Sequence, residues 1–313
     1  MTRAGGNESC REAGLSAGAG LSYCMSRARI VTVWWLACLL WSAGWLFIKI
    51  GLSDLPPVTF VALRLTLAFI VLSPIVTWRD EWKLLRISDL PVIAVSGLLL
   101  LGVNFTLTFW GAQYLPSALA SVLQATSPVF GFLIGISTGA ERFSLARGLA
   151  LPIGVAGVAL VSSGQFAAGP LAGWGSAAVV GGAACAALAY AMVKRRAAHL
   201  PSPLMVAMQT LSAMIPLLVA AVIIDGHPLQ HNWTAQAIGA LLYLAIASSV
   251  VAFWLNYWLL KRVSATTVLS MALVQPLIAA VLGAVVLGER FGAAAAAGGA
   301  MILLSAAVIL KRE

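Results

Sequence analysis

The sequence has 313 residues, of which 61% are hydrophobic and only 9% are charged. A soluble domain carries about a quarter charged residues, so the composition excludes an ordinary soluble protein and indicates that lipid covers most of the surface. The formal charge of +9 does not indicate nucleic-acid binding, because the basic residues lie in short clusters between apolar runs and form no continuous patch.

Residues 1–29 are rich in Gly, Ser and Ala and contain no apolar core, so we expect a disordered N-terminal tail rather than a cleaved signal peptide. The next run, 30–50, follows Arg27 and Arg29 and is long enough to cross a bilayer as an uncleaved signal anchor. Nine further apolar runs follow, separated by Pro, Gly or polar residues. The predicted spans are 30–50, 58–77, 92–113, 117–137, 146–163, 174–193, 204–224, 237–260, 265–287 and 292–310.

The basic residues predict the orientation of these ten spans. With the N-terminus inside, sixteen of the 19 Lys and Arg residues fall on the inner side and only Arg290 on the outer side, while Lys49 and Arg64 lie inside spans. Short loops facing the cytoplasm carry an excess of Lys and Arg. We therefore predict a multi-pass protein of the plasma membrane, specifically a bacterial inner membrane, with both termini cytoplasmic.

The two halves of the chain repeat each other. Glu141, in TGAERF, recurs as Glu289, in VLGERF, at a shift of 148 residues, and Lys49 recurs as Lys194 at a shift of 145. Because each half holds five spans, the second half must be inverted in the membrane, as in many secondary transporters. The fold class predicted is an all-α integral membrane protein of ten helices, built as two inverted five-helix repeats at 30–163 and 174–310.

The residues also resemble a known family. The segments WSAGWLFIK and PPVTFVALR in the first half, with the Glu-Arg-Phe triplets that follow the fourth and ninth spans, resemble the EamA type of the drug/metabolite transporter superfamily over about residues 30–310. The resemblance implies cytoplasmic termini, a central cavity between the halves, and substrates such as amino acids, sugars, nucleotide sugars or drugs. We therefore expect a secondary transporter that moves a small metabolite or drug by alternating access, as an exporter.

Other functions are less compatible with the sequence. An intramembrane metalloenzyme would need a motif such as H-E-x-x-H, which is absent, and no aspartate lies within a predicted span, so we expect no enzyme, no cofactor and no bound metal. A channel would need a filter loop or a ring of like residues. A channel or a structural membrane protein remains the alternative, although a structural role leaves the repeat unexplained. The expected partners are a small-molecule substrate and the lipid bilayer, not nucleic acid, with the protein a monomer or homodimer.

Polar and aromatic side chains within the spans are the candidates for a substrate site, because polar groups at that depth need a partner or water. Arg64 lies two turns into the second span and could attract a carboxylate near the outer mouth of a cavity. Alternatively, it snorkels to the outer surface or pairs with Glu289 or Asp54. The whole set either lines a central cavity or packs between helices: Trp41, Trp45, Arg64, Asn104, Thr108, Gln124, Asn256 and Gln275.

Four charged residues at span ends are candidate gates. The inverted repeat gives each side of the membrane one lysine and one glutamate, with Lys49 and Glu289 outside and Lys194 and Glu141 inside. We predict that these pairs close alternately. The alternative is that each glutamate caps the helix that begins just after it. Because the acidic residues near spans lie at helix ends or in loops, no mid-membrane proton relay is expected, which leaves exchange or electrochemically driven flux.

Overall fold

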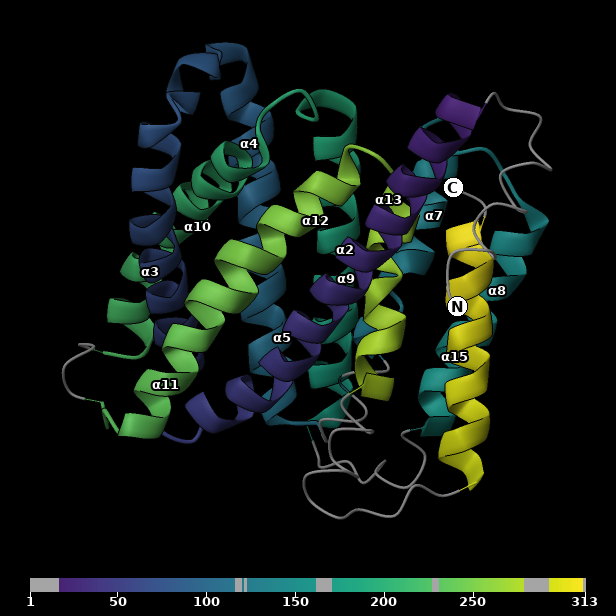
Figure 1. The fold of residues 1–313 in the computed structure, drawn as a ribbon. Coiled ribbons are helices and arrows are strands. Elements are labelled where there is room, and N and C mark those ends of the chain that lie inside the picture. The colour runs from purple at the N-terminus through teal and green to yellow at the C-terminus, as the bar shows by residue number, and fades with distance from the viewer. Residues whose placement is uncertain are drawn as a thin grey trace.

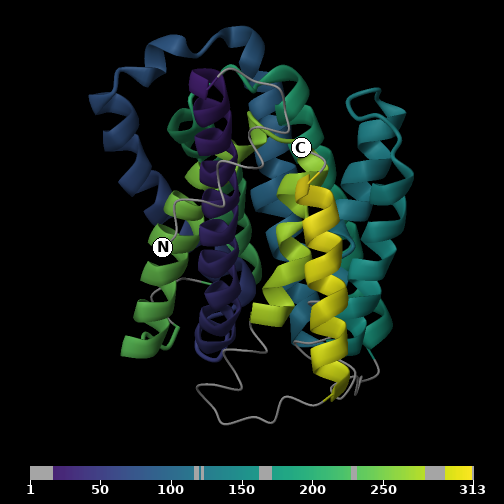
Figure 2. The ribbon, with the colours of Figure 1, turned by 45° about the vertical axis from the view of Figure 1, so that its right-hand side comes forward.

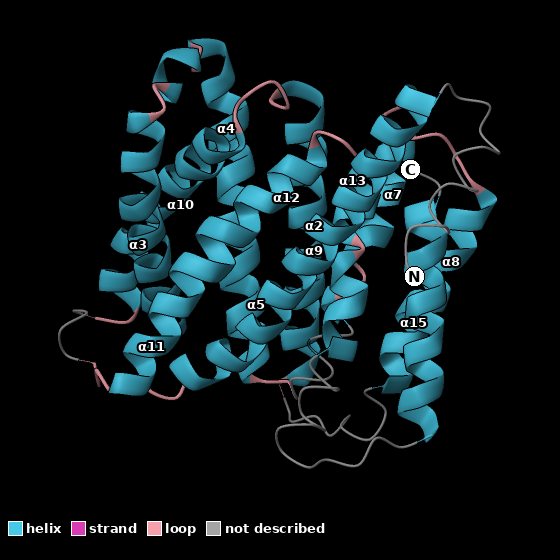
Figure 3. Cartoon of the chain, viewed as in Figure 1, coloured by secondary structure: helices cyan, strands magenta, loops and turns pink. Residues whose placement is uncertain are grey.

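The computed structural model describes residues 17–115, 120, 123–161, 171–226, 231–278 and 293–311, and the regular structure within them is entirely helical (Figure 3). The first part of the chain forms α2 (Ala17–Gly51), α3 (Pro57–Trp78), η1 (Glu81–Leu84), η2 (Ile87–Asp89), α4 (Leu90–Gly97), η3 (Leu98–Val103), α5 (Asn104–Gln113), α7 (Ser127–Ser137) and α8 (Leu145–Val161). The second part forms α9 (Ala172–Arg196), α10 (Ser202–Ile224), α11 (Ala235–Tyr243), η6 (Leu244–Val251), α12 (Ala252–Leu260), α13 (Ala265–Leu269), a helical segment at 271–278, and α15 (Ala293–Lys311).

Many of these helices are suited to a membrane. Six are long and apolar enough to cross one, namely Arg27–Ile48, Pro57–Trp78, Ile87–Gln113, Gly173–Arg196, Ser202–Ile224 and Ala235–Leu260. Four shorter apolar helices overlap the other four predicted runs: Ser127–Ser137, Leu145–Leu160, Ala265–Ile278 and Ala296–Leu310. The protein is thus an all-helical integral membrane protein, and the count of ten spans stays a prediction.

Helix α2 begins earlier than the sequence indicated. It starts at Ala17, inside the segment expected to be a disordered tail, and runs without interruption to Gly51. Extending an existing helix costs far less than starting a new one, so the weakly helical residues before Arg27 can join the apolar span that follows them.

The helices pair across the middle of the chain. Helix α3 packs against α10 and α8 against α15, and these two pairs lie at opposite ends of the bundle (Figures 1 and 2). Between them, α2 contacts α11 and α12, α5 contacts α9, and α7 contacts α9 and α13. Each of these contacts joins a helix from the first half to one from the second, so the centre of the bundle lies between the halves.

The exterior is apolar, unlike that of a soluble protein. Large apolar side chains face outward, with Ile223 76% and Leu304 65% exposed, whereas Gln209 and Asn256 are fully buried. An apolar exterior is stable only against hydrocarbon, and buried amides need hydrogen-bonding partners or a polar cavity. The interior polar groups therefore mark where a site can form.

Two of the long helices contain a π-helical segment at their centre. Helix η3 interrupts α4 and α5, and η6 interrupts α11 and α12, while each stretch remains one continuous helix. A π-helix widens the turn and leaves backbone carbonyls without their usual i+4 partners, and such segments are frequent at functional sites. Both segments lie beside the same cavity.

Candidate substrate cavity

A cavity of about 130 Å³ lies between the helices of the two halves. In the first half of the chain, its wall includes residues of α2, α3, η3 and α5. In the second half, it includes residues of α9, η6, α12 and the 265–278 segment. Seven of the eight candidate residues named from the sequence line it: Trp41, Arg64, Asn104, Thr108, Gln124, Asn256 and Gln275. The side chain of Trp45, the eighth, lies outside the described part of the structure. Substrate binding by this set stays a prediction.

Arg64 is buried, with 3% of its surface exposed, and therefore does not snorkel to the outer surface. Its Nε donates to the Ser249 hydroxyl at 2.7 Å and its Nη2 to the Ser248 hydroxyl at 3.0 Å. The guanidinium carbon lies 4.5 Å from the centre of the Phe105 ring. The expected alternative partner Asp54 instead accepts a hydrogen bond from Thr234 at 2.5 Å, and Glu289 lies outside the described residues. Arg64 is thus a buried cation held by neutral groups.

Aromatic side chains form much of the remaining wall. Trp41 packs edge-on against Phe253 with ring centres 5.2 Å apart, and its indole N–H donates to the Ser248 carbonyl in η6 at 3.1 Å. Phe105 lies 6.2 Å from Phe253 and 6.1 Å from Phe109. Trp41 is therefore both a cavity wall and a structural contact, so the two roles weighed from the sequence coexist.

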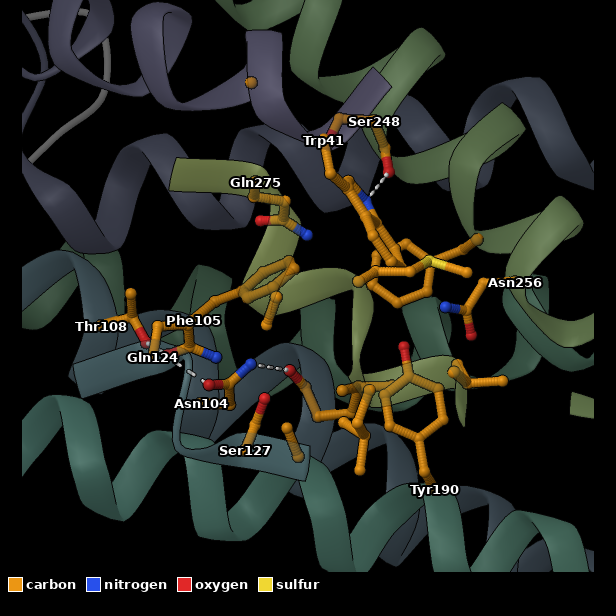
Figure 4. A pocket seen from close by; sticks show the side chains of 18 of the residues that line it. Trp41, Asn104, Phe105, Thr108, Gln124, Ser127, Tyr190, Ser248, Asn256 and Gln275 are labelled. Atoms are coloured by element: carbon orange, nitrogen blue, oxygen red, sulfur yellow. Dashed lines mark hydrogen bonds between the residues drawn. The ribbon is translucent and has the colours of Figure 1, made fainter. Parts of the chain in front are cut away.

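Polar side chains gather at two sides of the cavity (Figure 4). On one side, the Thr108 hydroxyl lies 3.3 Å from the Asn104 Oδ1 and 3.4 Å from the Gln124 Oε1, and the Asn104 amide donates to the Leu100 carbonyl at 3.2 Å. These are long bonds, so a solute with better geometry could replace them at little cost.

On the other side, Asn256 faces Tyr190 (Figure 4). Asn256 has no exposed surface, and neither its amide nitrogen nor its carbonyl oxygen has a hydrogen-bond partner. The Tyr190 hydroxyl does interact with it, but the geometry falls short of a hydrogen bond. A buried amide left in this state costs about 1–3 kcal/mol. On this side of the cavity, the Asn256 nitrogen therefore lacks an acceptor and the Asn256 oxygen lacks a donor.

Sequence reasoning missed several lining residues. Tyr190 sits in an Ala-rich helix without a polar pattern, and Ser248 lies in a π-helix where a 3.6-residue period no longer predicts which way a side chain faces. Phe105 and Phe253 counted as ordinary apolar residues. One signal was available for this pair, because the 148-residue shift relates them.

The two inner gate candidates hold the connection between α12 and α13. Lys194 Nζ donates to the carbonyls of Leu260 at 2.5 Å and Val263 at 2.7 Å. Glu141 Oε1 accepts from the Thr266 backbone N–H at 3.2 Å and from its hydroxyl at 2.9 Å. Glu141 thus binds the first turn of α13, which belongs to the other half of the chain. The alternative predicted from the sequence placed its contacts at the helix that follows it, α8.

The gating role of these residues stays a prediction. Glu141 Oε2 also lies 3.4 Å from Arg147 Nη1, and both side chains are nearly buried. Glu289 and the side chain of Lys49, the outer pair, lie outside the described residues.

Among the residues that the structure describes, no group of three His, Cys, Asp or Glu side chains is placed to hold a metal ion.

A bundle of apolar helices around a central, partly polar cavity defines a multi-pass membrane protein with an internal cavity. The sequence matches the model of the EamA-like transporter family twice, over residues 29–163 and 173–311. The chain belongs to this family and is a membrane transporter.

The relatives agree with this assignment. An Escherichia coli protein described as the uncharacterized inner membrane transporter YedA is 30% identical, with 80% of each chain covered. A Bacillus subtilis protein described as the uncharacterized transporter YoaV is 26% identical over 80% of this chain and 86% of its own. A probable amino-acid metabolite efflux pump of Escherichia coli is 24% identical over 82% and 86%. These names describe transporters rather than enzymes.

The fold also has a solved counterpart. A structure described only as "Crystal structure of protein" superposes with a TM-score of 0.75 at 21% sequence identity, covering 90% of this chain and 96% of that chain. At this identity the likeness concerns the fold alone.

Proposed function

We propose that this protein exports a small solute across a bacterial inner membrane by alternating access, with the central cavity as the solute site. The observation that carries the proposal is the cavity itself, because its wall is divided between the two halves of the chain. If the halves rock against each other, the same side chains face first one side of the membrane and then the other.

Several observations support two inverted five-helix repeats. The family model matches twice, with bounds close to those of the sequence repeat. Each half holds one helix with a central π segment, η3 in the first and η6 in the second. The packing is reciprocal, since α2 contacts the π-containing helix of the second half and α9 contacts that of the first.

The direction and orientation rest on weaker support. The basic residues favour ten spans with cytoplasmic termini. The relative named as a probable efflux pump handles amino-acid metabolites, which makes such metabolites the first solutes to test. In this proposal the partners are that solute and the bilayer, and the charged pairs Lys194 with Glu141 and Lys49 with Glu289 close the two sides in turn.

Counterflow in proteoliposomes tests the proposal. We would reconstitute the full chain and follow radiolabelled leucine, phenylalanine and 4-methyl-2-oxopentanoate, with the unlabelled compound inside. Saturable uptake that overshoots equilibrium is expected, because a carrier exchanges solute through one site. Flux that rises linearly with concentration and shows no overshoot would identify a channel instead. Uptake into everted vesicles, but not into right-side-out vesicles, is the result expected of an exporter.

A matched pair of variants shows whether flux passes through the cavity. Ala272 lines it, and Ala272→Phe would fill much of the available 130 Å³, so counterflow should fall at least about 10-fold. Ala300, on the exposed surface of α15, takes the same substitution outside the cavity, so Ala300→Phe should leave flux unchanged. Equal flux in both variants would contradict the assignment of the site.

A further inference from the structure

We propose that the cavity selects organic monoanions, namely monocarboxylates with a compact apolar body, over zwitterionic amino acids of the same size. This inference rests on the proposed transport function and adds the charge and shape of the solute. Three features of the cavity carry it: an arginine with no acidic partner among the described residues, a buried amide without a hydrogen bond, and a small aromatic chamber.

The first feature is the charge of Arg64. Its side chain contacts two serine hydroxyls and the Phe105 ring, all neutral, and no acidic side chain appears among the described residues that line the cavity. The helix-end aspartates do not pair with Arg64: Asp54 accepts from Thr234, and Asp225 accepts from Thr59 at 2.7 and 2.9 Å. The cavity therefore holds one positive charge with no counter-charge of its own among the described residues.

A carboxylate fits that charge in geometry as well as in sign. A guanidinium carries five N–H donors in a planar fork, and carboxylates bind such a fork through two parallel hydrogen bonds. The serine hydroxyls engage the Nε and Nη2 atoms and hold the fork in place. A buried cation gains most from a partner that is also removed from water, which is what an occluded carboxylate would be.

An ammonium group finds no carboxylate among the described lining residues. The amino group of a zwitterion would bring a second positive charge into a cavity that already contains one, and no described lining residue is acidic. Aromatic faces can bind ammonium groups, but the Arg64 guanidinium already lies 4.5 Å from the centre of Phe105. A monoanion neutralises the cavity, whereas a zwitterion leaves it with a net charge of +1.

The second feature is Asn256. Its amide is fully buried and without a hydrogen-bond partner, and it faces the cavity (Figure 4). An amide offers both a donor and an acceptor, so it can bind either an oxo or a hydroxyl oxygen next to the carboxylate. A solute oxygen at this position removes the cost of leaving the amide unpaired. The solute class is thereby narrowed to 2-oxo and 2-hydroxy acids.

The third feature is size. The cavity measures about 130 Å³, with Trp41, Phe105 and Phe253 in its wall. An engineered apolar cavity of about 150 Å³ holds benzene. A body of roughly the same bulk, such as a branched chain of four or five carbons, therefore fits against this aromatic wall.

The charge of the solute also supplies a driving force. A monoanion that leaves the cell moves with an inside-negative membrane potential, and each 100 mV sustains a concentration ratio of about 50-fold for one charge. No coupling ion is then needed. A zwitterion with no net charge gains nothing from the potential.

Two compounds with the same carbon skeleton test the selection. Radiolabelled 4-methyl-2-oxopentanoate has a net charge of −1 at pH 7.4, and leucine, a zwitterion, has a net charge of zero. In counterflow by the wild-type protein, we expect a kcat/KM for the oxo acid at least about 10-fold above that for leucine. We also expect its efflux to follow a potassium-diffusion potential. An equal or greater kcat/KM for leucine would overturn the inference while leaving transport established.

Variants connect the preference to the residues. Arg64→Gln installs the residue found at the equivalent position of the second half, and it should lower kcat/KM for the oxo acid by about 30-fold or more and that for leucine by much less. Lys83→Gln removes the same charge from the surface helix η1, where the Lys83 side chain is 74% exposed, and should change neither. Equal losses for both solutes in Arg64→Gln would overturn the role of its charge.

A second variant covers the case in which Arg64→Gln does not fold. Asn256→Asp adds a carboxylate to the cavity and should shift the preference from the oxo acid toward leucine by about 10-fold. An unchanged preference would overturn the charge argument.

Ligand-induced thermal stabilisation in detergent separates the two proposals. Stabilisation by the oxo acid without counterflow would refute the transport mechanism and retain the selectivity. Stabilisation by leucine alone would refute the selectivity.

Discussion

Arg64 and Gln209 occupy equivalent positions in the predicted repeat, and the structure treats them differently. Each is buried, and each side chain reaches a serine in the π-containing helix of the opposite half. The Gln209 amide is hydrogen-bonded at both ends: its nitrogen donates to the Ser96 hydroxyl at 2.6 Å, and its carbonyl accepts from the Tyr257 hydroxyl. Arg64 borders the cavity and carries more donors than its partners use.

The difference shows how a symmetric scaffold yields an asymmetric site. In one half this helix contact holds a neutral amide that is hydrogen-bonded at both ends. In the other half it holds a charged guanidinium that borders the cavity. A closed polar network contributes to stability, whereas an open one is available to a ligand. Changes around Gln209 should therefore affect folding, and changes around Arg64 should affect the solute.

The largest loss of stability is expected at Gly97, which lies against Gln209. A Cβ at this position would lie 2.7 Å from the carbonyl oxygen and 2.8 Å from the Cα of Gln209, which are backbone atoms. Helices α4 and α10 would have to move apart. We expect Gly97→Ala to lower the free energy of unfolding by about 3 kcal/mol, measured by thermal or denaturant unfolding in detergent. A loss below about 1 kcal/mol would show that the contact is looser than described.

Gln209→Leu comes next. The substitution keeps the approximate volume but removes the acceptor for the Tyr257 hydroxyl and the donor to Ser96. Because Tyr257 is buried, the orphaned hydroxyl should cost about 2 kcal/mol of stability. The same unfolding measurement checks this, and counterflow per folded molecule should stay near the wild-type value. A stable variant with impaired flux would place Gln209 in the transport site instead.

Tyr257→Phe removes one member of the same network from the other side. The Gln209 carbonyl loses its partner, but its amide keeps the bond to Ser96. One neutral hydrogen bond contributes about 1 kcal/mol net, so half the effect of Gln209→Leu is expected. Combining the two substitutions should add almost nothing further, because they break the same bond. Full additivity in this double-mutant cycle would rule out the direct contact.

Gly44→Ala should have the smallest effect on stability and serves as the counterpart of Gly97→Ala on the open side. Its Cβ would lie 3.6 Å from both Leu244 Cδ2 and Ser248 Oγ, which is ordinary van der Waals contact. The free energy of unfolding should change by less than about 0.5 kcal/mol. Since Gly44 lines the cavity, the KM of bulky solutes should rise more than that of small ones. A large loss of stability would mean that the cavity is closed at this point.

Much of the architecture follows from the sequence because the bilayer imposes it. A span needs about twenty apolar residues, so the run predicted at 204–224 emerges as α10 at Ser202–Ile224. The cavity set followed from the same constraint, since Asn104 and Asn256 lie at a depth where an amide needs a partner. The fourth run, predicted at 117–137, differs in detail: α7 begins only at Ser127, so Pro128 lies in a first helical turn, where it costs no hydrogen bond, and not in the middle of a helix.

The finer details depend on tertiary contacts that no local pattern records. Ser248 and Ser249 look like ordinary small residues in a span, and only the approach of α3 makes them partners of Arg64. Glu141 was predicted from its position at a helix end, but its hydrogen bonds to Thr266 cross into the other half of the chain. Such choices are decided by which helix end lies nearest in space, not in sequence.

The π-helical segments have a consequence for how the cavity wall can change over evolutionary time. A π-helical turn holds about one residue more than an α-helical turn, so η3 absorbs its extra residue within the turn. Deleting one residue from η3 would therefore restore an α-helical turn and leave Asn104, Phe105 and Thr108 facing the cavity. The same deletion within α5 would rotate every residue after it by about 100° about the helix axis. The π segment is thus a position where relatives can lose or gain one residue without changing which side chains face the solute.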